Sequence, residues 1–579
     1  MKYKHIFQST LSAMVLLSAS GCTDLGETLY DQVDSSNFYN TRDDIIRSTL
    51  RPFEHAYWTV QSRHVLNELT ADQLITPTRD GWWDDGGKWR RLHYHQWNVE
   101  EGMEAQTEWN GCNQGIVQCN YVIEDLERLD PAKFGFSTEE FDNFKGQVRT
   151  LRAYFYLRLL DAFRNIPFSV SYYDSSKNTL SQVPPLQIFE FIESELKASI
   201  PLLVKKTALG EQGTLEGQWT QAGAAALLVR LYLNAQVYIG EERYSDCAVV
   251  AQDIIDGDYG TYQLASTWNA IFDYDNDTCD EMIFGFPSSM GYSYWLYQGD
   301  TYMWTGPANG FKYFKDEKSK CSNNPKYAAS PSYDLNGNLY TYQLGMPVQK
   351  FRKYPGDERM KLYRNLSNGR YEGLFLYGYL DYIDDNGVAK RVDAPGLPYT
   401  LYIRDAVGQF HDLAPNSWPS DKTSNLTKGD HNSGWHFVKY PRYSDDNPNQ
   451  MESDFVEIRL PEVIYSLAEC KIRAGLNDEA AVLLNSVRRR NYPDENLPEV
   501  LYAPEGKVKL DLDEMLDEWG REFFAEGRRR IDLIRFGKFS KGTWWDKSPD
   551  PDDHYQIFQL TRPVLNSNPN LKQNPGYGN

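Results

Sequence analysis

The chain has 579 residues and a formal net charge of −21, with 81 acidic against 60 basic side chains. This balance argues against nucleic acid and against anionic lipid surfaces as partners. The 40 tyrosines and 15 tryptophans are many for a hydrophilic chain and favour a recognition surface.

The first 21 residues have the pattern of a secretory signal. Lys2 and Lys4 precede a mostly apolar run from Ile6 to Leu17, which is too short to span a membrane, and small residues then lead into Cys22. This pattern predicts cleavage before Cys22 and lipid on its thiol, which would anchor the protein to a membrane. No later segment reaches 18 consecutive apolar residues.

The stretch "GWWDDGGKW" (81–89) sets three tryptophans among glycine and aspartate, which are loop residues. If it is extended, Trp82 and Trp83 point to opposite sides, so that at least one ring is exposed. Arg79 and Asp84 lie close enough in sequence to supply hydrogen bonds beside such a ring. The alternative is that the rings fasten a long loop to the rest of the protein.

The segment "WRRLHYHQW" (89–97) alternates like a half-buried strand. We therefore expect Trp89 and Trp97 in the core. His93 and His95 would share a strand face, but a third metal ligand is not evident, so we expect a structural pair.

Helical patterns dominate residues 22–256. Apolar residues follow a 3–4 spacing within 146–168, and the other face of that segment is also apolar, so the helix must be covered on several sides. The segment 220–238 is rich in small residues that allow a close neighbour, Gly240 follows it, and an amphipathic stretch comes next.

Residues 257–455 are rich in Gly, Asn, Asp, Pro and Tyr, with short alternating pieces at 281–286 and 374–383. The segment is too long for a linker and too aromatic for disorder, so we expect an irregular insertion of loops and short strands. Within it, "GYSYWLYQGDTYMWTG" (291–306) holds more aromatic side chains than a core could take up, among them Tyr294, Trp295 and Trp304.

Helical patterns return at 456–540. One helix ends at Gly475 and the next begins at once, and Asp511 with Glu514 forms a capping box before a further helix. Together with the N-terminal part, this predicts a mainly α protein built as a tetratricopeptide-like scaffold of helical hairpins. We expect one domain, 22–579, in which 541–579 is a C-terminal tail.

Several blocks of the chain resemble the SusD/RagB family of lipoproteins. They are "GQVRTLRAYFYLRLLDAFRNIPF", "TQAGAAALLVRLYLNAQVY" with "YSDCAVVAQDIID", "RLPEVIYSLAECKIRAG", "EWGREFFAEGRRRIDLIRFGKF" and "NPNLKQNPGY", in that order from 146 to 577. The resemblance implies an outer-membrane, cell-surface, glycan-binding lipoprotein. Its partner would be a SusC-type TonB-dependent transporter. It further implies that an early loop and the insertion form one aromatic cradle.

On this interpretation the glycan-binding residues are expected among Trp82, Trp83, Arg79, Asp84, Tyr294, Trp295 and Trp304. A tryptophan face suits a pyranose because the axial C–H groups of the sugar form an apolar patch. Polar neighbours could then bind the equatorial hydroxyls.

Other kinds of site are not supported by the sequence. The segment 273–284 begins like a calcium loop, but Thr278 replaces the required glycine and Phe284 the closing glutamate. No CxxC and no common catalytic or phosphate-binding motif occurs. Of the cysteines, only Cys279 and Cys321 lie in loop-like sequence where they could pair. We expect no cofactor and no metal site.

Non-catalytic capture of a polysaccharide or oligosaccharide is the favoured function. A surface glycoside hydrolase is an alternative, because its two carboxylates need no linear motif. A protein-binding scaffold is a further one, since helical-hairpin arrays often bind proteins.

Overall fold

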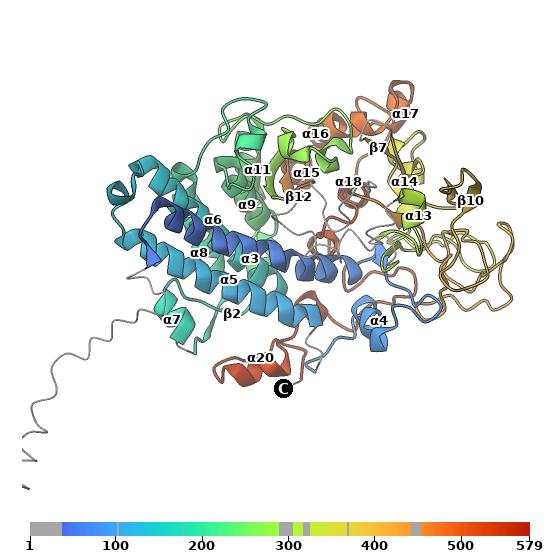
Figure 1. Ribbon diagram of the computed structural model, residues 1–579, viewed down its shortest axis with the longest axis horizontal. Coiled ribbons are helices and arrows are strands. Elements are labelled where there is room, and N and C mark those ends of the chain that lie inside the picture. The colour runs from blue at the N-terminus through green and yellow to red at the C-terminus, as the bar shows by residue number, and fades with distance from the viewer. Residues whose placement is uncertain are drawn as a thin grey trace, which may run out of the picture.

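The computed structural model describes residues 38–100, 103–177, 179–288, 305–315, 325–366, 370–441 and 453–578. Long helices gather at one end of the molecule, and the irregular chain of the insertion gathers at the other (Figure 1). The mainly α architecture predicted from the sequence is confirmed.

The N-terminal helices pack on one another in chain order. Helix α3 (Arg42–Leu69) lies against α5 (Met103–Arg128), α5 against α6 (Thr138–Phe163), and α6 against α8 (Pro185–Ser199). Capping boxes begin two of them, at Thr41 for α3 and at Ser137 for α6, and each satisfies backbone N–H groups that the first turn leaves without partners.

Helix α6 is buried on nearly every side, as its apolar sequence predicts. One reason is a close approach to α5. A Cβ atom built at Gly115 of α5 would lie only 2.3 Å from the ring of Phe155, so the glycine allows the two helices to touch. Such backbone-to-ring contact leaves no space for solvent between the helices.

The small-residue segment forms α9 (Gln221–Leu233) and the short α10 (Ala235–Ile239), and α11 (Tyr244–Ile255) folds back against α9. Beyond the insertion, α15 (Leu460–Arg473) packs on α11 and α16 (Asn477–Arg488) packs on α15. The two halves of the helical scaffold are therefore in direct contact although the insertion separates them in sequence.

The predicted helix boundaries in the C-terminal half are close to those observed. Gly475 follows α15 in the left-handed region, at φ 79°, and ends the hairpin turn. Asp511 is the N-cap of α18 (Leu512–Glu522), accepting a hydrogen bond from the Glu514 N–H at 3.0 Å.

The insertion is tied to the scaffold by a two-stranded antiparallel sheet. Strand β4 (Met282–Phe286) pairs with β12 (Phe455–Arg459), with Phe286 opposite Phe455, and every residue of both strands is buried. Because β4 lies near the start of the insertion and β12 follows its end, the pairing brings the two ends of the insertion close together.

The chain preceding the tryptophan-rich stretch also joins the insertion. Strand β1 (Leu74–Ile75) pairs antiparallel with β5 (Ala328–Ala329) of the insertion. Ile75 and Ala328 then share a small apolar cluster with Val407, Leu426 and Trp545. An early loop and the insertion are thus joined by backbone pairing and by a shared apolar cluster.

The remaining elements are short. Those outside the insertion are α4 (Lys88–His93), β2 (Ile166–Pro167), α7 (Tyr172–Lys177), β3 (Gln182–Val183), α17 (Leu497–Val500), α19 (Arg529–Arg535) and α20 (Arg562–Ser567). Those within it are α13 (Phe311–Phe314), α14 (Pro347–Arg352), β6 (Arg364–Asn365), β7 (Tyr371–Glu372), β8 (Phe375–Leu376), β9 (Asp381–Ile383), β10 (Ala389–Arg391) and β11 (His436–Phe437). Among the described helices, none has the length and apolar character needed to cross a membrane.

Candidate functional site

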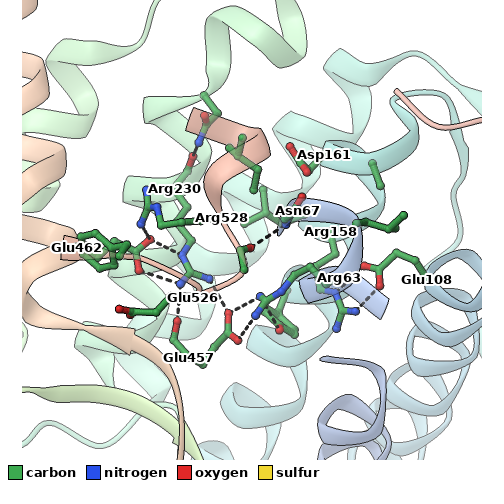
Figure 2. Close-up of a pocket in the computed structure, with 18 of the residues that line it drawn as sticks. Arg63, Asn67, Glu108, Arg158, Asp161, Arg230, Glu457, Glu462, Glu526 and Arg528 are labelled. Carbon is green, nitrogen blue, oxygen red and sulfur yellow. Dashed lines mark hydrogen bonds and ion pairs between the residues drawn. The ribbon is translucent and has the colours of Figure 1, made fainter. Parts of the chain in front are cut away.

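A cavity inside the scaffold is lined by charged residues from both helical halves (Figure 2). At its centre, Glu457 of β12 accepts hydrogen bonds from Arg63 of α3 at 2.5 and 2.6 Å and from Arg230 of α9 at 2.8 Å. Arg230 also pairs with Glu462 of α15 at 2.6 Å. These pairs bind the N-terminal helices to β12 and α15.

The charged residues of this cavity hold the fold together and do not form a ligand site. Its volume of about 90 Å³ can hold a few water molecules, whereas pockets for organic ligands occupy roughly 300–1,000 Å³. Burial alone would raise the pKa of Glu457, but Arg63 and Arg230 outweigh burial and lower that pKa to about 2. The carboxylate therefore stays charged and pairs with both guanidinium groups, while Arg230 has Glu462 as a second partner.

The tryptophan-rich stretch begins with a tight hairpin turn. The backbone N–H groups of Arg79 and Trp82 each donate to the other residue's carbonyl at 2.9 Å, and the two residues between them, Asp80 and Gly81, have φ 49° and 89°. Positive φ at both central positions is the type I′ geometry, for which Asp-Gly is a favoured pair. The turn places the side chains of Asp80 and Trp82 beside the insertion.

The buried side chain of Arg79 fixes this turn to the insertion. Its side chain is fully buried, and its guanidinium donates to the carbonyls of Pro325 at 3.0 Å, Asp430 at 3.3 Å, and Ser433. The sequence prediction that Arg79 contacts a sugar conflicts with this position, because its donors face backbone carbonyls of the protein. Arg79 instead supports the loop.

Trp82 is half-buried and has an aromatic support. Its ring meets the imidazole of His431 edge to face, with centroids 5.1 Å apart and planes at 90°. Burial, with the positive charge of Arg79 second, lowers the pKa of His431 to about 4, so the imidazole is neutral at neutral pH. Neither of its ring nitrogens has a hydrogen-bond partner among the described residues. A ring that is supported yet partly exposed suits stacking on an apolar sugar face.

Trp83 turns toward the body of the protein. It packs against the main core, lies edge to face with Trp89 at 6.4 Å, and has the Lys326 ammonium 5.8 Å from its ring centroid. Its φ of 64° is unusual for a bulky side chain and directs it away from the path of Trp82. This packing favours the fastening role for Trp83.

Asp84 is exposed and forms an ion pair with Arg90 of α4. Such a pair is weakly held in solvent, so the carboxylate is accessible to a ligand, but nothing in its surroundings aims it at Trp82. Asp85 differs because it accepts a hydrogen bond from the indole N–H of Trp89 at 2.5 Å.

The strand expected over 89–97 is wrong, and the stretch 81–89 is not extended. Three residues of 3-10 helix at Asp85–Gly87 lead into α4, which contains His93. The burial expected of Trp89 and Trp97 is confirmed. His93 and His95 hold structure: His93 Nε2 lies 3.1 Å from the Trp545 carbonyl, and His95 Nδ1 lies 2.7 Å from Asp550.

A polar cluster surrounds the turn. The sequence does not predict this cluster. The Tyr399 hydroxyl donates to Asp80 Oδ2 at 2.8 Å and accepts from the His431 backbone N–H at 3.3 Å. On the other side, His411 Nε2 lies 3.0 Å from Asp80 Oδ1. The only sequence signal for these contacts is the Asp-Gly pair, which predicts the turn but not its partners more than 300 residues away.

Tyr399 also reaches an open pocket of about 650 Å³ on the insertion. Asn309, Lys312, Asp393 and Thr400 line it together with Tyr399, so its polar groups include amide, ammonium, carboxylate and hydroxyl. The volume is that of an organic ligand site, and Tyr399 links the pocket through Asp80 to the turn that carries Trp82.

The remaining predicted residues, Tyr294, Trp295 and Trp304, lie outside the described residues, as do Cys22 and Cys321. Over the described ranges, no group of three or more His, Cys, Asp or Glu side chains is arranged to hold a metal ion. The surface formed by Trp82, Asp80, Tyr399, His411 and His431 is called the Trp82 surface below.

The class of protein defined by these features is a helical-hairpin scaffold whose insertion, joined by an early loop, presents a supported aromatic ring and an open polar pocket. Comparison with known families agrees. The profile of the SusD family matches residues 315–577, and the profile described as "Starch-binding associating with outer membrane" matches residues 40–233. The chain belongs to the SusD/RagB family.

The relatives include a starch-binding protein and several solved structures. The chain is 23% identical over 557 residues to the starch-binding protein SusD of Bacteroides thetaiotaomicron, covering 88% of this chain and 84% of that one. The structure of NanU from Bacteroides fragilis superposes with a TM-score of 0.63 at 18% identity, covering 96% of this chain and all of NanU. Surface glycan-binding protein A from Bacteroides fluxus gives 0.62 at 15% identity, with 93% and 100% covered.

Proposed function

We propose that this protein binds a polysaccharide or oligosaccharide at the cell surface, without acting on it chemically, and passes it to a SusC-type TonB-dependent transporter in the outer membrane. The glycan-binding relatives and the outer-membrane description of the family support this assignment. Lipid on Cys22 would anchor the protein beside its transporter.

The observation that carries the proposal is the position of Trp82. Its ring is half-buried, rests on His431, and stands beside a carboxylate, a phenol and an imidazole that can exchange hydrogen bonds with hydroxyl groups. An aromatic face with a few polar groups at its edge is what binding of a sugar ring requires.

The acidic clusters are better suited to structure than to glycoside hydrolysis. The carboxylates of Glu457 and Glu462 face arginines inside the 90 Å³ cavity, where a glycan cannot reach them. Asp80 is accessible, but the groups that contact its two oxygens belong to Tyr399 and His411. Binding without cleavage therefore fits the Trp82 surface.

An affinity-gel screen tests the binding function. Soluble starch, laminarin, galactomannan, polygalacturonate, alginate and chondroitin sulfate are cast in native gels, and retardation of the protein is measured. We expect at least one polymer to retard it, and no shorter products when that polymer is incubated with the protein and analysed by chromatography. Product release would replace the proposal by a hydrolase, and no retardation on any glycan would contradict it.

The anchor and the transporter are tested in cells. The Cys22→Ala variant, expressed without the transporter, should be absent from the outer-membrane fraction. Without the transporter, the lipid on Cys22 is what attaches the protein to the membrane, and the variant lacks it. The unaltered protein, extracted in mild detergent, should bring down a large β-barrel protein. Retention of the variant in the membrane would contradict the anchor, and repeated recovery of the protein alone would contradict the partnership.

A further inference from the structure

Two cations beneath the Trp82 surface, Arg79 and Lys326, are turned inward. Arg79 is fully buried and donates to backbone carbonyls. Lys326 is also fully buried, with its ammonium 3.9 Å from the ring centroid of Trp89 and 4.8 Å from that of Tyr327. These two positive groups stabilise the loop from beneath, and neither can reach a ligand at the surface.

The partly exposed arginines of α4 already have partners. Arg90 pairs with Asp84, and Arg91 donates to the Gly86 carbonyl at 2.8 Å. A carboxylate or sulfate group on a ligand would have to displace one of these contacts. Protein sites for such anions ordinarily supply Arg or Lys donors that are free to form paired hydrogen bonds.

The carboxylate of Asp80 has the opposite arrangement, because it faces the surface. Its side chain is 14% exposed and that of its partner His411 is 47% exposed. The Tyr399 hydroxyl holds Oδ2, which leaves Oδ1 and the imidazole as the accessible edge of the pair. Carboxylate oxygen accepts hydrogen bonds and imidazole can donate or accept, so together they match neighbouring hydroxyls of a sugar.

Resting on the proposed function, we infer that the Trp82 surface selects uncharged glycans, and that Asp80 with His411 is the pair that makes this selection. A neutral sugar stacked on Trp82 can donate a hydroxyl to Asp80 and exchange a second hydrogen bond with His411. A uronate or sulfated sugar in the same place meets the Asp80 charge, while the cations of residues 79–91 are buried or already hold a partner.

Binding measured at pH 8 and low salt tests the inference. Low salt is chosen because repulsion between charges is least screened at low ionic strength. Among the six polymers named above, we expect binding to starch, laminarin or galactomannan and at least tenfold weaker binding to polygalacturonate, alginate and chondroitin sulfate. A bound glucan is then compared with the same glucan oxidised at C6 to the carboxylate, which keeps the ring hydroxyls and adds only charge.

The Asp80→Asn variant isolates the carboxylate. Its amide oxygen can still accept from Tyr399, so the turn is preserved and the melting temperature should stay close to that of the parent. We expect affinity for the neutral glycan to fall about tenfold, since a hydrogen bond to a charged group is lost, while affinity for the oxidised glycan does not fall. The matched control is Asp385→Asn, an exposed aspartate in the turn between β9 and β10, which should change neither affinity.

The outcomes separate this inference from the function on which it rests. Preferential binding of an anionic polymer, or equal losses for both glycans in Asp80→Asn, would overturn the selection of neutral sugars and leave glycan capture standing. Absence of binding to every polymer would remove the proposed function itself. A His411→Gln variant that binds the neutral glycan like the parent would assign the selection to Asp80 alone and overturn the paired role.

Discussion

The scaffold interior and the Trp82 surface use charged residues in opposite ways. In the scaffold, Glu457 lies between Arg63 and Arg230 within a 90 Å³ cavity, and each charge is satisfied by another side chain of the protein (Figure 2). At the Trp82 surface, Asp80 keeps part of its carboxylate exposed beside a half-buried ring. Charges that hold a fold face one another, whereas charges that bind a ligand must leave an edge open.

The two regions therefore fail differently when they are altered. Removing one partner of a buried ion pair leaves the other buried and uncompensated, which is costly to the whole domain. Removing a surface ring takes away contact with the ligand and leaves the fold nearly unchanged. The following substitutions separate stability from affinity on this basis.

The largest expected effect on stability is that of Glu457→Gln. It leaves Arg63 and Arg230 without their shared carboxylate, so the free energy of unfolding should fall by about 3–5 kcal/mol. Urea denaturation followed by circular dichroism measures this change. Glycan affinity of the protein that remains folded should be that of the parent; a stability within 1 kcal/mol of the parent would show that the network contributes little.

Trp83→Ala should have a moderate effect of the same kind. Trp83 packs against Trp89 and lies near the Lys326 ammonium, so its loss should lower the free energy of unfolding by about 2 kcal/mol. Isothermal titration with the glycan identified in the screen should give an affinity within a few-fold of the parent. Loss of binding at unchanged stability would show that Trp83 stacks on the sugar and does not fasten the loop.

Acid should weaken the scaffold by a smaller amount that depends on Glu457. Its pKa is lowered to about 2 in the folded protein, so the stabilisation that it gives is complete above about pH 4.5 and is lost as the pH falls toward 2. Between pH 6 and pH 3.5 the expected loss from this group is about 1 kcal/mol. Urea denaturation of the parent and of Glu457→Gln at both pH values isolates the contribution of Glu457. An equal loss of unfolding free energy in the two proteins between pH 6 and pH 3.5 would contradict the assignment.

Much of the scaffold could be predicted because its signals are local. Gly475 ends a helix, Asp511 begins one, and the apolar faces of α6 require burial on several sides, each through a property of neighbouring residues.

The site was less predictable because its contacts are distant in sequence. Alternation of polar and apolar residues predicts a strand over 89–97, but the chain forms α4 there, after the Asp80-Gly81 turn and two glycines at positive φ. Arg79 is predicted among the glycan-binding residues, but its buried guanidinium donates to the carbonyls of Pro325, Asp430 and Ser433. The pairing of Asp80 with Tyr399 and His411 spans 319 and 331 residues, which no local pattern encodes.

The central claim is that the ring of Trp82 holds the glycan, and substitutions of two tryptophans, Trp82 and Trp58, test it most directly. Trp58 of α3 is 41% exposed on the scaffold and serves as the matched control. By isothermal titration and thermal melting, Trp82→Ala should lose at least 30-fold in affinity, about 2 kcal/mol, with an unchanged melt, and Trp58→Ala should bind like the parent. Parent-like affinity in Trp82→Ala, with the protein folded, would contradict the account.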